Sequence, residues 1–252
     1  MMSNKEIEQL ENKYLNKFYY FLKYAEDEMM LGFQTKEKIK DDWQGKYGTN
    51  ISNFAVGAER IIYALFNGKG VGQPNSCPVG ADMFFEVEDA YIHIDLKTVQ
   101  TRNIGDITRS IFVGRNQNSY KGTMLVNTKA GIIKRDYEPA LPTFYNKGKK
   151  AEKICLSYFV TIVYEDVNLN ILNINLICMP NGNLESHYKT RVLQAGKNLD
   201  KTRFRFTEVP TFELLKGEKS RVKVVYFDQK MHYTLSKKLS FYKDIYLEQG
   251  DF

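Results

Sequence analysis

Apolar positions near the amino terminus recur at intervals of three and four residues, whereas several later segments alternate with a period of two. The first pattern predicts one long helix over residues 3–30, which begins at a capping box formed by Ser3 and Glu6. Its apolar face packs either on its own domain or on a second copy of the chain, and the pattern favours neither. A shorter helix is predicted over residues 35–43, and another runs from Ser52 or Asn53 to Phe66.

Period-two and continuous apolar runs in the rest of the chain predict strands. Residues 67–78 hold several glycine and proline residues and connect the third helix to the first strand, and the basic stretch 148–153 is a linker. The segment 233–247 is either a helix or a strand–helix pair. The predicted strands cover residues 83–87, 90–96, 154–164, 169–179, 202–207 and 221–227, with a further hairpin over 124–133.

An acidic two-residue turn separates the first two predicted strands. If Val87 pairs with Ala90 across that turn, Asp82 lies directly opposite Asp95, and Lys97 projects from the same face. The other face of the second strand is apolar and is predicted to be core. Like charges directly opposite each other destabilise a sheet. A divalent cation offsets this repulsion, because Mg²⁺ takes hard oxygen ligands such as carboxylates, phosphate oxygens and water. The alternative is a solvated hairpin face without an ion.

The composition is that of a globular protein, since 43% of the 252 residues are apolar and 13% are aromatic. This length suits a single domain. Its parts are a helical region (1–50), a catalytic core (51–135), a β-rich region (150–230) and a closing element (231–252). Lysine and arginine outnumber aspartate and glutamate by 36 to 30, a formal charge of +6. Such a surplus suits a polyanionic partner, or serves only solubility.

The three cysteines, Cys77, Cys155 and Cys178, have no C-x-x-C spacing, so we expect buried free thiols in a reducing compartment. The amino-terminal residues are too charged for a signal peptide. No apolar run approaches the length that spans a bilayer. These features predict a cytoplasmic protein that has no membrane partner and no organic cofactor.

Two short motifs carry a resemblance to a known family. Ala81-Asp82 and Asp95-Leu96-Lys97 resemble the PD…(D/E)xK motif of a nuclease superfamily, with Ala81 in place of its frequent proline. The order of the elements around them resembles that of type II restriction endonucleases in the branch that contains EcoRV, BglI and SfiI. The resemblance implies an α/β fold with a mixed central sheet flanked by helices, and a β-rich DNA-reading subdomain.

The same resemblance implies a chemistry. Asp82 and Asp95, with the backbone carbonyl of Leu96, would bind Mg²⁺, and Lys97 would position the attacking water. Glu59, on the helix before the hairpin, would reach the metal centre; the alternative is a surface glutamate. The implied function is Mg²⁺-dependent, site-specific cleavage of double-stranded DNA by a homodimer, leaving 5′-phosphates. The resemblance also implies an intracellular protein of a prokaryote. The alternatives are a repair or junction-resolving nuclease, a non-catalytic sequence-specific DNA-binding protein, and a protein without a nucleic-acid function.

Basic and amide side chains are frequent in residues 99–122, and such groups contact phosphates and base edges. Basic residues also alternate along the last two predicted strands. Arg221 and Lys223 share one face while Val222 and Val224 point to the core, and a resemblance to a base-reading strand favours this pair as guanine contacts. A solvated edge strand is the alternative. The predicted DNA contacts are Arg115, Asn116, Gln117, Asn118, Lys121, Arg203, Arg205, Arg221 and Lys223.

Overall fold

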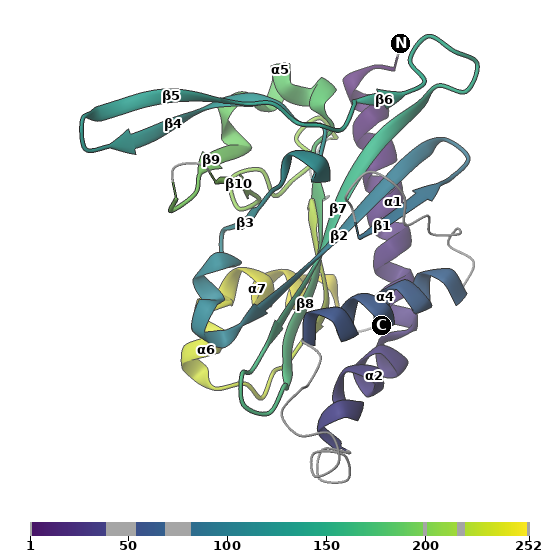
Figure 1. Cartoon of the computed structure of the whole chain (residues 1–252). Helices are drawn as coiled ribbons and strands as arrows, with labels where there is room; N and C mark the ends of the chain where they lie inside the picture. Colours follow the sequence, from purple (N-terminus) through teal and green to yellow (C-terminus); the bar gives the residue numbers. More distant parts are fainter. Residues whose placement is uncertain (1, 39–53, 69–81, 199–200, 216–219, 251–252) are drawn as a thin grey trace.

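The computed structural model describes residues 2–38, 54–68, 82–198, 201–215 and 220–250. Its centre is a mixed sheet in the order β1-β2-β7-β8-β11, with β6 paired to one end of β7 (Figure 1). β2 and β7 run parallel and the other pairs are antiparallel, which confirms the predicted α/β fold with a mixed sheet. The strands of this sheet are β1 (Met83–Glu86), β2 (Ala90–Gln100), β6 (Phe144–Tyr145), β7 (Lys153–Tyr164), β8 (Ile171–Met179) and β11 (Val222–Phe227).

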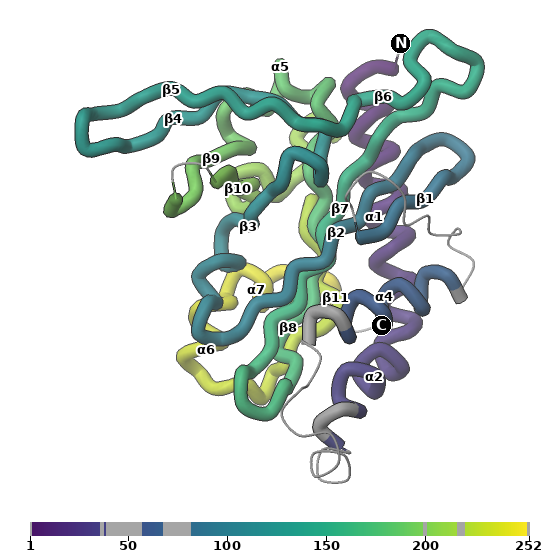
Figure 2. Tube along the Cα trace, in the orientation of Figure 1, coloured from purple at the N-terminus to yellow at the C-terminus, as the bar shows by residue number. Residues whose placement is uncertain are grey.

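The β1–β2 hairpin has the predicted register. Met83 pairs with Ile94, and Phe85 pairs with Ile92. The Val87 amide donates to the Ala90 carbonyl at 2.9 Å, which closes the acidic turn. β2 crosses the middle of the molecule beside β7 (Figure 2). β7 pairs with the whole of β2, and β1 pairs with its first half, up to Ile94.

Both faces of β2 are covered. The predicted core face, which carries Ala90, Ile92, Ile94 and Leu96, is buried throughout. The face that carries the charged residues is also covered, since His93 is only 1% exposed and its Nε2 lies 3.0 Å from the Tyr145 hydroxyl. The charged side chains of β2 therefore sit at a partly closed position and not on an open surface.

The helices agree with the sequence pattern except at one break. The capping box at Ser3 and Glu6 is present, but the predicted single helix over residues 3–30 ends at a cap on Ala25, where a second helix follows. The segment 233–247 is helical, which decides between its two alternatives. The helices are α1 (Asn4–Tyr24), α2 (Glu26–Lys38), α4 (Phe54–Gly68), α5 (Glu185–Tyr188), α6 (Tyr233–Lys238) and α7 (Ser240–Gln249), with 3₁₀ turns η1 (Thr101–Asp106), η2 (Arg115–Gln117), η3 (Gly182–Leu184) and η4 (Lys189–Arg191).

The apolar face of α1 packs on its own domain. The Phe18 ring lies 5.3 Å from Tyr158 of β7 and 5.5 Å from Phe66 of α4, both centroid to centroid and edge to face. Phe18, Leu15 and Leu22 have no exposed surface. Of the two alternatives for this helix, packing within the domain accounts for its apolar stripe.

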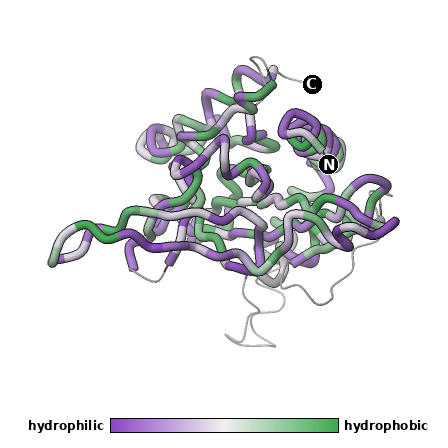
Figure 3. Tube along the Cα trace, turned by 90° about the horizontal axis from the view of Figure 1, so that it is seen from above, coloured by the Kyte–Doolittle hydropathy of each residue, from purple (hydrophilic) through white to green (hydrophobic). Residues whose placement is uncertain are grey.

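A second group of strands stands beside the main sheet. β3 (Ser110–Phe112), β10 (Thr202–Arg205) and β9 (Leu193–Ala195) form one small sheet, and β4 (Gly122–Thr128) with β5 (Gly131–Tyr137) forms the predicted hairpin. That hairpin projects from the body of the protein (Figures 1 and 3). We call it the β4–β5 arm.

Several sequence predictions fall on residues that the structure does not describe. They are most of the helix predicted over 35–43, the cap at Ser52 or Asn53, residues 69–78 of the predicted connector with Cys77, and Ala81 of the motif. Cys155 and Cys178 are buried free thiols, as predicted. Among the described helices, none has the length and apolar character needed to cross a membrane.

Replacing Phe18 with alanine tests the packing of α1. Removing a fully buried phenylalanine leaves a cavity, so Phe18→Ala should lower the free energy of unfolding by about 3–5 kcal/mol. Urea denaturation measures it, with Tyr24→Ala at an exposed position of the same helix as the control, expected within about 1 kcal/mol. A loss that grows as the protein is diluted would instead assign this face to a contact between copies of the chain.

Candidate active site

The β1–β2 hairpin brings Asp82 close to the charged end of β2. Asp82 immediately precedes β1, and its Oδ2 accepts a hydrogen bond from the Leu96 amide at 2.6 Å. Asp95 and Lys97 lie on either side of Leu96 and project to the other face from it. The structure thus brings the three predicted motif residues together, while their roles remain a prediction.

Asp95 is the most constrained of these groups. Its side chain is 6% exposed, Oδ2 forms an ion pair with Lys97 Nζ, and Oδ1 accepts a hydrogen bond from Gln117 Nε2 at 2.6 Å. The pKa of Asp95 is raised to about 6, and burial is the largest cause. The nearby charge of Asp82 acts in the same direction, and the Lys97 ammonium opposes both effects. An additional cation beside this buried carboxylate would stabilise its ionised form.

Gln117 belongs to this site, although the sequence pointed to it only as a DNA contact. Its Oε1 accepts hydrogen bonds from Lys97 Nζ at 3.2 Å and from the Gly114 amide at 2.7 Å. The amide therefore touches both Asp95 and Lys97. No periodic signal marks this role, because Gln117 lies on the short turn η2, some twenty residues further along the chain than its two partners.

Glu59 lies on α4, the helix that precedes the hairpin and contacts β2. Its side chain is exposed. Partial burial raises the pKa of Glu59, and the negative charge of Asp82 contributes to the same shift. Glu59 is therefore near enough to Asp82 to feel its charge, on the side of the site that faces solvent.

The residues at this site suit a hard divalent cation. In the described part of the chain, no cluster of three or more His, Cys, Asp and Glu side chains is preformed for a metal. Two carboxylates are nevertheless present, and Asp95 Oδ2 is buried with the Lys97 ammonium as its neighbour. Mg²⁺ needs only one or two protein carboxylates, because water and phosphate oxygens complete its shell. The donor set fits such an ion once a phosphate is present.

Comparison with known proteins identifies the family. Residues 3–168 match the profile of the N-terminal domain of the type II restriction enzyme MwoI, and residues 171–227 match the profile of its central domain. The chain belongs to this family of restriction enzymes. It is therefore a site-specific deoxyribonuclease, which decides against the non-catalytic alternatives. A search of curated proteins found no match.

Two solved structures share the fold of this MwoI-family enzyme. The restriction endonuclease BglI, bound to its DNA recognition sequence, has a TM-score of 0.65 at 14% identity, covering 88% of this chain and 92% of that one. Tetrameric SfiI, bound to cognate DNA, has a TM-score of 0.67 at 15% identity, covering 91% and 88%. At such identities the likeness concerns the fold alone.

The predicted DNA contacts near η2 divide into exposed and buried groups. Arg115, Asn116 and Lys121 are exposed, and the prediction for them stands. Asn118 is fully buried, where its Nδ2 donates to the Gly114 carbonyl at 3.1 Å and to the Tyr137 hydroxyl at 2.9 Å. The prediction of Asn118 as a DNA contact is therefore wrong, because its amide is used inside the MwoI-family fold.

Arg203 and Arg205 of β10 also bind their own chain. Arg203 is only 6% exposed, and its guanidinium donates to the hydroxyl of Ser110 at 2.8 Å and to the carbonyl of Ser110 at 2.6 Å. The predicted DNA contact at Arg203 is wrong, because this side chain ties β10 to β3. Arg205 keeps a partly exposed side chain beside Glu208, so its prediction stands.

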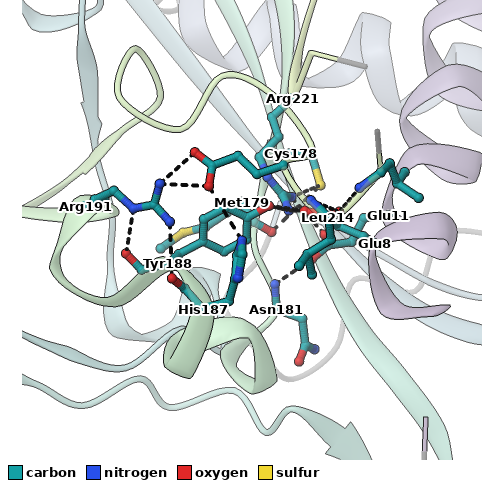
Figure 4. Close-up of polar contacts among 12 residues, drawn as sticks. Glu8, Glu11, Cys178, Met179, Asn181, His187, Tyr188, Arg191, Leu214 and Arg221 are labelled. Atoms are coloured by element: carbon teal, nitrogen blue, oxygen red, sulfur yellow. Dashed lines mark hydrogen bonds and ion pairs between the residues drawn. The ribbon is translucent and has the colours of Figure 1, made fainter. Parts of the chain in front are cut away.

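The largest correction concerns Arg221 (Figure 4). Its guanidinium has no exposed surface and donates to Glu11 Oε2 at 2.8 Å, to Glu8 Oε1 at 3.0 Å and to the Tyr188 hydroxyl at 2.8 Å. Glu8 and Glu11 are also fully buried, on α1. Arg221 cannot reach a base edge from this position, so the prediction that it reads guanine is wrong.

Lys223 shares the covered face with Arg221, as the alternation predicted. Its Nζ lies 5.7 Å from the centre of the Tyr19 ring, which also belongs to α1. The prediction that Arg221 and Lys223 share a face was therefore correct, but α1 covers that face. Glu8 and Glu11 are three residues apart, the spacing of the apolar stripe of α1, and they lie beside Ile7 of that stripe. Acidic residues at this spacing were the sequence signal that the buried face of α1 contacts a cation.

Replacing Arg221 with methionine tests its structural role. The variant leaves two buried carboxylates without their cation, so Arg221→Met should lower the free energy of unfolding by about 3–5 kcal/mol. Adding Glu8→Gln and Glu11→Gln removes these charges and should recover part of the loss in urea denaturation. Arg205→Met is the partly exposed control, expected within about 1 kcal/mol. Normal stability of Arg221→Met, with lost discrimination between cut and uncut sequences, would restore the base-reading role.

Proposed function

We propose that this restriction enzyme hydrolyses the phosphodiesters of double-stranded DNA with Mg²⁺ and leaves 5′-phosphates. The observation that carries the proposal is the convergence of Asp82, Asp95 and Lys97 at the open end of the β1–β2 hairpin. Asp82, Asp95 and the carbonyl of Leu96 would hold the ion. When bound, Mg²⁺ lowers the pKa of a coordinated water and stabilises the charge that develops on the phosphate.

The remaining groups have roles that follow from their charge. Lys97 is 23% exposed at its side chain and lies beside Asp95, so its ammonium reaches both the carboxylate and an incoming phosphate. There it positions the attacking water and compensates the negative charge of the phosphate. Glu59, at the solvent side of Asp82, would orient a further water or support a second ion.

We further propose that the enzyme acts as a symmetric homodimer. One site of this kind cleaves one strand, so two copies related by a two-fold axis place two sites across the duplex. A two-fold arrangement also matches a palindromic or interrupted palindromic sequence. SfiI, which has a similar fold, is tetrameric on its cognate DNA. Sedimentation of the enzyme–DNA complex distinguishes the proposed dimer from a tetramer.

Replacing Asp95 tests the catalytic assignment. Asp95→Ala removes a proposed ligand, so cleavage of a plasmid with mapped cut sites should fall by roughly a thousandfold or more. Binding to the same DNA should be kept or improved, because a carboxylate that repels phosphate is lost. EDTA should abolish cleavage by the wild-type enzyme, and Mg²⁺ should restore it.

The control for this variant is Asp89→Ala. Asp89 belongs to the turn of the same hairpin, where it forms an ion pair with Lys13 at the surface. Its replacement should leave the cleavage rate within about threefold of wild type. Cleavage by Asp95→Ala at a near-normal rate, or equal loss in both variants, would refute the assignment.

Replacing Lys121 tests the phosphate contacts around η2. Each phosphate contact that is lost reduces the slope of log affinity against log salt by about one unit. Lys121→Ala should therefore lower the slope by about one on both cut and uncut sequences, as measured by fluorescence anisotropy. Lys13→Ala, which removes an exposed lysine of α1, is the control. A change in sequence preference with an unchanged slope would make Lys121 a base contact.

A further inference from the structure

The amide of Gln117 contacts three groups at once. Nε2 donates to Asp95 Oδ1 at 2.6 Å, and Oε1 accepts from Lys97 Nζ at 3.2 Å and from the Gly114 amide at 2.7 Å. These contacts fix the orientation of the amide, because the opposite orientation would turn its oxygen toward a carboxylate and its NH₂ group toward an ammonium. The site therefore selects one of the two orientations.

Few side chains can satisfy these neighbours together. A carboxylate needs donors and an ammonium needs acceptors, and an amide presents both, on two separate atoms, without adding a charge. Because Gln117 occupies Oδ1 of Asp95, the Lys97 ammonium pairs with Oδ2. The amide thus holds the rotation of the Asp95 carboxylate and also holds the ammonium at a fixed distance from it.

The turn that carries Gln117 is held by the root of the β4–β5 arm. The Gly114 carbonyl accepts hydrogen bonds from the Tyr137 hydroxyl at 2.9 Å and from Asn118 Nδ2 at 3.1 Å. Arg115 Nε donates to the Glu138 carbonyl at 2.7 Å, and the Ala140 amide donates to the Arg115 carbonyl at 2.7 Å. The end of β5 and the residues after it therefore fasten the turn from both sides.

A side chain at Gly114 would displace the side chains of Asn116 and Gln117. A Cβ atom there would lie 2.8 Å from Asn116 Oδ1 and 3.2 Å from Gln117 Cδ. The φ angle of Gly114 is −81°, which any residue adopts, so an added side chain would disturb the placement of the two amides and not the backbone conformation. The sequence Gly-Arg-Asn-Gln is therefore fitted to the placement of Gln117.

We propose that Gln117 is a positioning residue that sets Asp95 and Lys97 for cleavage, and that Tyr137 at the root of the β4–β5 arm holds Gln117 in place. The inference rests on the proposed catalytic roles of Asp95 and Lys97. Gln117 acts through these two groups and needs no contact with DNA. Its loss consequently affects the rate of the chemical step more than the binding of the substrate.

The first test replaces Gln117 in the full-length protein. With a duplex that carries a mapped cut site at saturating enzyme and Mg²⁺, the single-turnover rate should fall roughly ten- to a hundredfold in Gln117→Ala, the scale of a lost hydrogen bond to a charged group. Gln117→Glu, which has the same size but places a second carboxylate against Asp95, should lose at least as much. Binding without Mg²⁺ should stay within about threefold of wild type in the alanine variant.

Gln249→Ala is the matched control for the loss of a partly buried amide. Gln249 also makes three hydrogen bonds, each of 3.0 Å, to the amide and carbonyl of Val224 and to the Tyr19 hydroxyl, at the far end of α7. If Gln117 were merely structural, both variants would lower the unfolding midpoint and neither would lower the single-turnover rate of the folded fraction. That result would overturn the proposal.

A second route leaves Gln117 itself unchanged. Gly114→Ala should push the amide away and reproduce part of the loss of rate, whereas Gly105→Ala, where a Cβ meets nothing within 4 Å, should not. Tyr137→Phe removes the hydroxyl that holds the Gly114 carbonyl and should slow cleavage in the wild-type background. In the Gln117→Ala background it should have no further effect, because the two residues act through one contact.

The outcomes separate this inference from the proposed function. If Asp95→Ala is inactive while the Gln117 and Gly114 variants cleave at the wild-type rate, the positioning role is refuted and the proposed site stands. If Asp95→Ala cleaves normally, the proposed site fails and the inference fails with it. Equal losses of binding and rate in Gln117→Ala would make Gln117 a DNA contact, as the sequence predicted.

Discussion

The constraint on which the rest of this structure depends is the burial of the Asp95 carboxylate in the middle of a sheet. β2 pairs with β7 along its whole length and with β1 up to Ile94, and the Asp95 side chain is only 6% exposed, so it loses most of its water. An isolated charge at such a position is strongly unfavourable. The structure offsets the cost locally, with Lys97 two positions along the same strand and the Gln117 amide on the remaining oxygen. The period of two along a strand is enough to place Lys97 on the same face as Asp95.

A second buried ionic group, formed by Arg221, Glu8 and Glu11, has a structural role alone. Arg221 joins α1 to the start of β11 through Glu8 and Glu11, and both of its terminal nitrogens donate to the chain itself (Figure 4). Burial raises the pKa of Glu11, and the Arg221 guanidinium opposes that shift. Such a group is costly to break, and its complete burial leaves no surface on which a ligand could bind. Asp95 differs, since its cationic partner Lys97 has a side chain that is 23% exposed, whereas Arg221, Glu8 and Glu11 have no exposed surface.

The sequence predicted local geometry well because that geometry depends on near neighbours. The turn between Val87 and Ala90 sets the register of the hairpin, and the period of two assigns each side chain to a face. What covers a face depends on contacts that are remote in sequence. Arg221 was placed on the correct face, but only the path of α1 shows that Glu8 and Glu11 lie over it.

The same limit explains the two neighbouring amides of the turn after β3. Gln117 and Asn118 have the same polarity, yet one reaches the charged end of β2 and the other binds the backbone of its own turn. Composition cannot separate them, since the direction of each side chain depends on how η2 is fastened. The break of the first helix at Ala25 is of this kind too, because neither glycine nor proline marks it.

The turn η2 links two surfaces that a sequence reading treats as separate. Arg115 and Asn116 are exposed and are proposed DNA contacts, while the next residue, Gln117, points to Asp95 and Lys97. A displacement of a three-residue turn moves all of its side chains together, because its backbone has few independent torsions. Contact at the exposed residues and the geometry at Asp95 are therefore joined by the covalent chain itself. In the proposed mechanism, η2 therefore carries both exposed side chains that are available to DNA and the amide that holds the proposed catalytic carboxylate.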